Sequence, residues 1–423
     1  MTVSIERKVL SLMTTQSGIS RVWDMGLRAE VFDDPMNRFV FTFMVDYWID
    51  AQMRQPPTWV VMEAEYPQVA LEDPDSIEES LDWLVSWLQK RYASVQVQDL
   101  LRQAAKTCNA DPSATVERLW HDAYDAAQVN APRYSRVDVT KNVAARRERY
   151  NRDLQDQTRA GVSIGLTELD DHTRGILPGE LAAVAAYTKT GKSWLLANAF
   201  VAALNNGLRP MFFTLEMGVP EIEDRIDAIY SGVSYQRFSQ RRMLPAEMIT
   251  MREAQNRMEG QHAGFIERPD RGERTVKHMV SRARQEGADL LIIDQLSFID
   301  AEREYGGDSA LRMKHGDIIF GLKDEIARES AGKIPCLLAV QLNRQSAASG
   351  GRGELYHFAN SSMVEQTVDL ALGLRRNNEM RDNNAMILDI MGSRRCDTKS
   401  WTLAWHLTDR TEIRIREEYV DNT

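Results

Sequence analysis

Apolar residues recur at helical spacing in the first part of the chain. From Leu81 to Leu88 they stand at i, i+3, i+4 and i+7, which places them on one face of a helix. Ser76, with Glu79 three residues later, predicts a capping box at the start of this helix. A second helix is predicted from an apolar stripe at steps of four, made of Phe39, Phe43 and Tyr47.

Glycine is absent between Gly26 and Gly161. Turns and irregular segments commonly need glycine, so its absence favours helices over this whole stretch. We expect residues 1–130 to form an all-helical domain that serves as a collar for packing and assembly. Residues 131–160 are highly charged and carry only a sparse apolar stripe. That pattern fits a linker helix that docks on a neighbouring subunit, with a solvated connector as the alternative.

A different pattern begins at Gly161. Short apolar runs such as LAAVAA and LLIID alternate with longer helical patterns, and glycine, proline or polar residues bound each run. The alternation predicts an α/β domain over residues 161–423, with a mostly parallel sheet and helices on both faces. The runs AMILDIM and WTLAWHLT add strands near the end of the chain.

Composition and charge narrow the class of protein. The 423 residues carry a net charge of −10, which argues against a surface coated in basic residues but allows arginines in a confined channel. No apolar run approaches the roughly 18 residues of a membrane span, and no signal-peptide pattern opens the chain. The three distant cysteines form neither a disulfide framework nor a zinc site. We therefore expect a cytoplasmic protein without a membrane partner.

The segment AYTKTGKS departs from the phosphate-loop pattern G-x-x-x-x-G-K-[ST] only at its first position, where Ala186 replaces glycine. A buried-strand pattern precedes the segment and a helix pattern follows it, so loop amides and a helix N-terminus would surround one anion. Alanine is tolerable there if the backbone keeps ordinary angles. Lys192 would reach the β and γ phosphates, and the Ser193 hydroxyl would hold Mg²⁺. The predicted nucleotide loop consists of Ala186, Tyr187, Thr188, Lys189, Thr190, Gly191, Lys192 and Ser193.

Three other predicted strands lead into polar residues. LLIID ends in Asp294, MFFTLE in Glu216 and CLLAVQ in Gln341. The carboxyl ends of parallel strands share one edge of a sheet, where sites form in such folds. A carboxylate at Asp294 suits Mg²⁺, one at Glu216 could polarise an attacking water, and the Gln341 amide could bond γ-phosphate oxygens. Four polar strand ends at one edge make a chance match to the phosphate-loop pattern a poor explanation.

Together these segments resemble the replicative hexameric DNA helicases of the DnaB type, whose motor is RecA-like. That family usually begins its phosphate loop with alanine. The segments TLEM, LLIIDQLSFI, AVQLNR and NSSMVEQTVDLAL resemble its motor segments, and GLTELDDHTRGILPGEL resembles the stretch that leads into the motor. The resemblance is strong from about Gly161 onward. Before Gly161, only the pattern of helices resembles that of the family. The compact chain and its divergent first domain favour a bacteriophage source within a bacterial cell.

The resemblance implies residue roles. It makes Lys192 the phosphate lysine and Ser193 the Mg²⁺ hydroxyl. Asp294 becomes the Mg²⁺ carboxylate, Glu216 the general base and Gln341 the γ-phosphate sensor.

The resemblance also implies an arginine that acts on a neighbouring subunit's site. Arg394 and Arg395 follow a predicted strand where the family places this residue. Arg394 is the favoured candidate, and Arg395 stays open. The family's helper lysine has no counterpart, because Gly392 or Ser393 holds its place. A shared site implies a ring or open ring of identical chains, and the resemblance implies that it is a homohexamer.

Single-stranded DNA would run through the ring, held by the loops after the Asp294 and Gln341 strands. Backbone amides and a few arginines suit sequence-independent phosphate binding. The first loop is mixed in charge, because Glu302, Glu304 and Asp308 accompany its cations. The expected DNA contacts are Arg312 and Lys314 in the first loop and Arg344, Gly350, Gly351 and Arg352 in the second.

The resemblance implies ATP hydrolysis with Mg²⁺, movement in the 5′ to 3′ direction, and exclusion of the complementary strand at a forked duplex. A primase and a helicase loader are the expected protein partners. Three alternatives stay open: a RecA-like recombination ATPase, a nucleotide-gated helicase-loading or assembly factor, and a clock ATPase of the KaiC type. The last usually carries two tandem motors, and this chain has one phosphate loop.

Overall fold

The computed structural model describes residues 2–51, 54–112, 115–116, 118–119, 122–123, 139–140, 142–155, 161–303, 305, 310–328, 332–342 and 366–419. Within helix α14 the side chain of Arg312 is not described. The chain separates into two compact units, Met1–Arg149 and Tyr150–Thr423. The domain bounds 1–130, 131–160 and 161–423 remain predictions.

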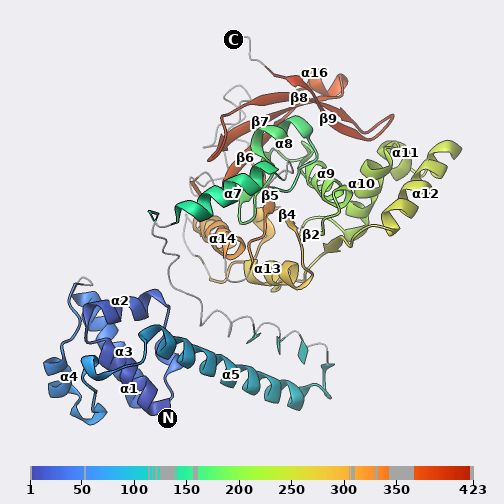
Figure 1. Cartoon of the computed structure of the whole chain (residues 1–423). Helices are drawn as coiled ribbons and strands as arrows, with labels where there is room; N and C mark the ends of the chain where they lie inside the picture. Colours follow the sequence, from blue (N-terminus) through green and yellow to red (C-terminus); the bar gives the residue numbers. More distant parts are fainter. Residues whose placement is uncertain are drawn as a thin grey trace. The chain divides into compact units, whose positions relative to one another are not determined.

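The N-terminal unit is helical, as the pattern predicts (Figure 1). Its helices pack around one core that includes Val9, Leu10, Val40 and Leu84. The α-helices are α1 (Thr2–Leu12), α2 (Gln16–Asp24), α3 (Pro35–Asp50), α4 (Trp59–Glu65) and α5 (Leu81–Thr107). Short 3-10 helices join them: η1 (Ala29–Val31), η2 (Pro67–Val69) and η3 (Pro74–Ser76).

The predicted capping box at Ser76 is wrong. Helix α5 begins four residues later, because the Ser80 hydroxyl accepts a hydrogen bond from the amide of Trp83 at 3.2 Å. Ser76 instead closes η3, and Glu79 forms an ion pair with Lys8 of α1 at 2.6 Å. The long-range ion pair is the contact that local spacing could not show.

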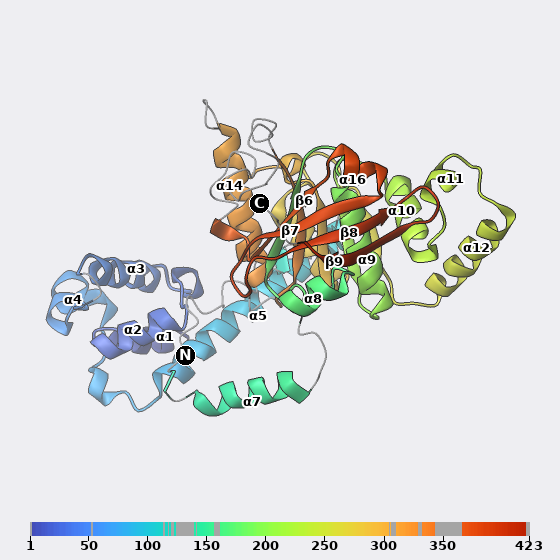
Figure 2. The same cartoon turned by 90° about the horizontal axis from the view of Figure 1, so that it is seen from above.

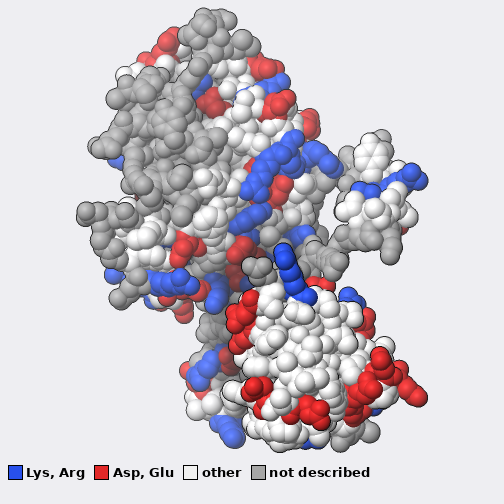
Figure 3. Space-filling model, turned by 90° about the vertical axis from the view of Figure 1, so that its left-hand side faces the viewer, with Lys and Arg blue, Asp and Glu red and all other residues white. Residues whose placement is uncertain are grey.

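The predicted apolar stripe on α3 is also displaced. Phe39 is 60% exposed and Tyr47 is 39% exposed, whereas Phe43 is partly buried at the edge of the core. The apolar residues that α3 buries are Val40, Phe41, Met44, Val45 and Trp48. Apolar residues occupy nearly all sides of α3, so spacing alone could not select the buried face. Figure 3 shows a face of this unit on which uncharged side chains form a broad area with acidic residues at its margins.

Helix α7 (Val143–Gln155) lies in the predicted linker. Tyr150 is 65% exposed, and Val139 just before the helix is 60% exposed. Tyr150 is thus an exposed apolar side chain on a charged helix, and the expected docking role of this helix stays a prediction.

The second unit is built on one sheet. Among the described residues its strands follow the order β3-β2-β4-β5-β1-β6-β7-β8-β9. Pairing is parallel from β3 to β6 and antiparallel from β6 to β9. The strands are β1 (Leu181–Ala186), β2 (Pro210–Thr214), β3 (Phe265–Glu267), β4 (Leu290–Asp294), β5 (Cys336–Gln341), β6 (Leu370–Arg375), β7 (Ala385–Ser393), β8 (Ser400–His406) and β9 (Glu412–Glu418).

Helices cover both faces of the sheet, as the alternating pattern predicts. Along β1, Ala182 and Val184 enter the core shared with α9, whereas Leu181 and Ala183 enter the core shared with α13 and α14. Figures 1 and 2 show α9 and α14 on opposite sides of the strands. The helical elements of this unit are α8 (Thr167–Thr173), α9 (Lys192–Asn205), α10 (Val219–Ser231), α11 (Tyr235–Ser239), α12 (Pro245–Glu259), α13 (Val276–Gln285), η4 (Leu296–Phe298), α14 (Ala310–Ala327) and α16 (Asn378–Asp382).

A buried carboxylate fixes the segment that leads into β1. Asp170 of α8 is fully buried and accepts a hydrogen bond from the Ser163 hydroxyl at 2.6 Å. It also accepts the backbone amides of Ile164 at 2.9 Å and Leu166 at 3.1 Å. One side chain therefore satisfies several buried donors of an otherwise irregular segment.

We expect Asp170→Ala to lower the free energy of unfolding by about 3 kcal/mol, because buried donors left without an acceptor cost roughly 1–3 kcal/mol each. Urea denaturation of the full chain measures the change. Glu168→Ala, an exposed position on the same helix, is the matched control and should shift stability by less than about 0.5 kcal/mol. Equal stability of the two variants would show that this carboxylate does not hold the segment.

Candidate functional site

Parallel register brings the predicted site residues to one edge of the sheet. Ala186, the last residue of β1, pairs with Gln341, the last residue of β5. Asp294, the last residue of β4, pairs with Thr214, the last residue of β2. The phosphate loop, Asp294, Gln341 and the segment after β2 that carries Glu216 therefore share the carboxyl edge, where such sheets place their sites.

The missing first glycine of the loop has a structural explanation. Ala186 belongs to β1, is fully buried, and its carbonyl accepts the amide of Leu342 at 3.1 Å. Within the loop, the residues whose backbone has a positive φ are Lys189 at 64° and Gly191 at 117°. Alanine is therefore tolerated at 186 because extended backbone does not require glycine there.

Gly191 is required for two reasons. Its φ of 117° lies in a region that L side chains rarely adopt. A Cβ at this position would also lie 2.6 Å from Cζ2 of Trp405. Trp405, on β8, is almost fully buried beneath the loop, so the antiparallel part of the sheet supports the phosphate loop.

Lys192 opens helix α9 and is buried, with 8% of its surface exposed. Its Nζ donates to the carbonyls of Ala186 at 3.0 Å and Tyr187 at 3.5 Å. Burial lowers the pKa of this amine, whereas the charges of Asp294 and Glu216 oppose that shift. A buried ammonium at a helix N-terminus and beside loop amides suits the phosphates of a nucleotide.

Ser193 and Asp294 form the candidate Mg²⁺ position. The Ser193 hydroxyl donates to the two carboxylate oxygens of Asp294 at 3.2 and 3.4 Å. Asp294 is fully buried, and burial raises the pKa of its carboxyl to about 6, with the charge of Glu216 adding to the rise. A hydroxyl and one carboxylate next to a phosphate loop fit Mg²⁺, which usually binds few protein ligands together with substrate phosphates and water.

Glu216 stands two residues beyond the end of β2, and its side chain is exposed. It lies close enough to Asp294 to raise the pKa of that carboxyl. An exposed carboxylate at the mouth of the site can reach a water molecule that approaches a γ-phosphate.

Arg225 is a functional candidate that the sequence reasoning missed. The guanidinium of this α10 residue lies 5.5 Å from the ring centroid of Trp194, and its charge lowers the pKa of Asp294. Arg225 therefore adds positive charge to the site within the same chain. Its position inside a long amphipathic helix gave no local signal.

Gln341 contacts the phosphate loop directly. Its Nε2 donates to the Thr188 hydroxyl at 2.7 Å, and its Oε1 accepts from Nε2 of Gln295 at 2.9 Å. Gln295 was also missed by sequence reasoning, although a polar residue directly after the apolar LLIID run is a readable signal.

The two candidate arginines after β7 differ in their surroundings. Arg395 forms an ion pair with Glu180 at 2.6 Å and donates to two backbone carbonyls near the end of α8. Arg394 donates to the Gln366 carbonyl at 2.8 Å and lies 3.5 Å from a carboxylate oxygen of Asp369, yet its side chain is 56% exposed. Arg395 is thus occupied within its own subunit, whereas Arg394 retains an exposed guanidinium.

The predicted DNA-binding residues are mostly outside the described residues. This applies to Arg344, Gly350, Gly351 and Arg352, and to the side chain of Arg312. Lys314 is described, and it lines a hollow beside α14.

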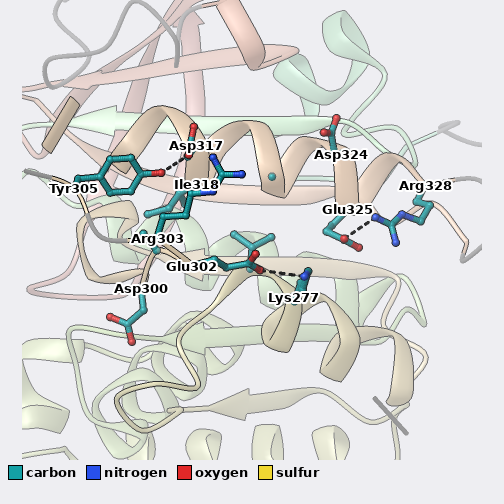
Figure 4. Close-up of a pocket in the computed structure, with 13 residues that line it drawn as sticks. Lys277, Asp300, Glu302, Arg303, Tyr305, Asp317, Ile318, Asp324, Glu325 and Arg328 are labelled. Carbon is teal, nitrogen blue, oxygen red and sulfur yellow. Dashed lines mark hydrogen bonds and ion pairs between the residues drawn. The ribbon is translucent and has the colours of Figure 1, made fainter. Parts of the chain in front are cut away.

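The described base of the first loop is held by the helices beside it (Figure 4). Tyr305 donates a hydrogen bond to Asp317 of α14, and Glu302 pairs with Lys277 of α13 at 3.6 Å. These contacts line a hollow of about 340 Å³ between the two helices. Glu302, an acid that made the loop look mixed in charge, is therefore partly neutralised by a local partner.

Comparison with known proteins identifies relatives. Residues 161–411 match the model of the DnaB-like helicase C terminal domain. A replicative DNA helicase DnaB of Leifsonia xyli subsp. xyli is 26% identical over 233 residues, which are 54% of this chain and 50% of that protein. A replicative DNA helicase DnaB of Treponema pallidum is 24% identical over 295 residues, covering 68% of this chain and 64% of that protein. This chain spans about half the length of the Leifsonia xyli protein that it matches.

Solved structures share the fold. One, described as a DnaB-like replicative helicase and its interactions with primase, aligns with a TM-score of 0.69 and 18% identity. That alignment covers 97% of this chain and 99% of the other. A second solved structure, an isolated ATPase domain, aligns with a TM-score of 0.58 and 20% identity, over 67% of this chain and 100% of the other. The predicted fold, an α/β domain with a mostly parallel sheet preceded in the chain by a helical region, is thereby confirmed.

We expect Asp294→Asn to make the chain more stable at pH 8 by about 1–3 kcal/mol. The folded pKa of about 6 lies above the usual value of 3.8, so the folded chain binds this proton more tightly than the unfolded chain. The contribution of Asp294 to stability therefore falls as pH rises from about 4 to about 6, and stays low above that. The neutral amide removes this dependence.

Urea denaturation of parent and variant at pH 4.5 and pH 8 measures the effect. The advantage of Asp294→Asn should be larger at pH 8, and Asp324→Asn, at an exposed site, should show no such change. A difference between parent and Asp294→Asn that stays constant across this range would contradict the assigned environment.

Proposed function

The chain belongs to the family of DnaB-like helicase C-terminal domains, and we propose that it is an ATP-driven replicative DNA helicase. The observation that carries the proposal is the gathering of Lys192, Asp294, Glu216 and Gln341 at one sheet edge. Each has a chemical role in phosphoryl transfer that its surroundings support.

ATP is the proposed substrate, with Mg²⁺ as its metal partner. Lys192 and the loop amides would bind the phosphates, and Ser193 and Asp294 would hold Mg²⁺, which would supply positive charge for phosphoryl transfer. Glu216 orients and deprotonates the attacking water, and Gln341 bonds the γ-phosphate. The Glu216 carboxylate is suited to the base role because it is exposed to water at the mouth of the site.

Arg394 is the proposed residue that completes a neighbouring subunit's site. Its exposed guanidinium can reach outward, and Arg395 is held by Glu180 in its own subunit. An arginine supplied by a neighbour stabilises the charge that develops in the transition state. Such a shared site requires a closed or open ring of identical chains, and six is the number that the family resemblance implies.

The proposed track is single-stranded DNA in the centre of the ring. The two loops that would grip it follow β4 and β5, directly beyond Asp294 and Gln341. Hydrolysis in successive subunits would move these loops along the strand in the 5′ to 3′ direction while the complementary strand is excluded. Primase and a helicase loader are the proposed partners, and one of the solved relatives is described with its interactions with primase.

Unwinding of a forked DNA duplex in the presence of ATP and Mg²⁺ tests the function. The parent chain should separate the strands, and Lys192→Ala should not, because the buried ammonium is removed. A fork whose 5′ arm is single-stranded and whose 3′ arm is double-stranded should be unwound, and a fork with these two arms exchanged should not. DNA-stimulated hydrolysis without unwinding, together with strand exchange, would favour a recombination ATPase; nucleotide binding without hydrolysis would favour an assembly factor.

We expect Arg394→Ala to reduce ATP hydrolysis at least about 100-fold while nucleotide affinity and ring assembly stay nearly unchanged. Arg395→Ala should instead lower the free energy of unfolding by about 2 kcal/mol, since it removes the ion pair with Glu180 and bonds to two carbonyls. Steady-state hydrolysis, nucleotide titration and thermal unfolding of both variants separate the two roles. Normal hydrolysis by Arg394→Ala would exclude it from the site.

A further inference from the structure

A chain of hydrogen bonds crosses the carboxyl edge of the sheet. Gln295 follows β4, Gln341 ends β5, and Thr188 lies in the phosphate loop after β1. Gln295 Nε2 donates to Gln341 Oε1 at 2.9 Å, and Gln341 Nε2 donates to the Thr188 hydroxyl at 2.7 Å. Three segments that lie far apart in the sequence thus meet in one polar network.

In this structure the Gln341 amide has its carbonyl oxygen toward Gln295 and its NH₂ group toward the loop. An amide side chain has a donor end and an acceptor end, and rotation by half a turn exchanges them. Because Gln295 donates to the carbonyl oxygen of Gln341, the NH₂ group of Gln341 is directed at the phosphate loop. Phosphate oxygens accept hydrogen bonds and repel a carbonyl oxygen, so only this orientation suits a γ-phosphate.

Gln295 is itself held in place. It is only 6% exposed, and its backbone adopts φ 94° and ψ 105°, which is rare for a residue with a side chain. Backbone strain of this kind persists where surrounding structure enforces it, often at functional sites.

We propose that Gln295 is a positioning residue that holds the Gln341 amide with its NH₂ group toward the γ-phosphate of ATP. The inference rests on the sensor role given to Gln341 under the proposed function. Gln295 does not touch the nucleotide. It distinguishes ATP from ADP only through Gln341, because ADP has no γ-phosphate to receive the bond.

The test uses the full chain, with Mg²⁺ present, and compares affinity for a non-hydrolysable ATP analogue with affinity for ADP. Gln295→Met is nearly isosteric and neutral but cannot donate, so the Gln341 amide is free to turn. We expect the analogue to bind about fivefold more weakly, in line with one lost hydrogen bond, and ADP to bind within about twofold of the parent.

A double-variant cycle isolates the coupling. Gln341→Ala alone should weaken the analogue by about tenfold and leave ADP unchanged. Adding Gln295→Met to Gln341→Ala should cause no further loss, because no amide remains to be positioned. The control is Gln255→Met on α12, whose amide donates to Asp227 away from the site, and it should change neither affinity.

The outcomes separate the two proposals. If Gln341→Ala discriminates between the nucleotides and Gln295→Met does not, the positioning role is overturned and the sensor stands. A Gln341→Ala variant that binds both nucleotides like the parent would overturn the sensor role and the positioning role together. If Gln295→Met lowers the affinity for the analogue and for ADP equally, and also lowers the unfolding temperature, then Gln295 has only a structural role.

Discussion

The parallel pairing of β1 with β5 is the constraint on which the rest of the site depends. Register places Ala186 opposite Gln341, so the phosphate loop and the candidate sensor leave the sheet at the same point. Because β4 pairs beside β5, Asp294 arrives at that edge as well, within reach of Ser193 at the start of α9. Apolar side chains on both faces of β1 hold this register, since a shift by one residue would exchange its two faces.

Burying charged side chains at the carboxyl edge of the sheet costs free energy. Lys192 is buried with a lowered pKa, and Asp294 is buried with a raised one, so each ion is held in a place that disfavours its charge. Mutual attraction between the two offsets part of that cost. A metal ion and a phosphate chain would supply the remaining compensation, which links nucleotide binding to the stability of the loop.

Much of the motor could be predicted from sequence because its strands are continuous apolar runs with polar ends. Most of the features that were predicted wrongly or missed depend on contacts between residues that lie far apart in the sequence. Glu79 forms an ion pair with Lys8 instead of capping a helix. Strand β9 was not expected, although Ile413 and Ile415 alternate with charged residues as in a half-buried strand. Gln295 stands directly after an apolar run, but its contact with Gln341 follows only from the pairing of β4 with β5. Local spacing could not choose between Arg394 and Arg395 either; both form ion pairs, and the greater exposure of the Arg394 side chain is what distinguishes them.

In the proposed ring, each subunit carries an incomplete site that a neighbouring copy completes. Lys192→Ala chains lack a working loop but keep Arg394, whereas Arg394→Ala chains keep the loop. Each variant alone should hydrolyse almost no ATP. Co-assembled from a mixture, they should recover hydrolysis, because some interfaces then join an intact loop to an intact arginine. If hydrolysis by the mixed assemblies never exceeds the sum of the two separate variants, the site is not shared between subunits.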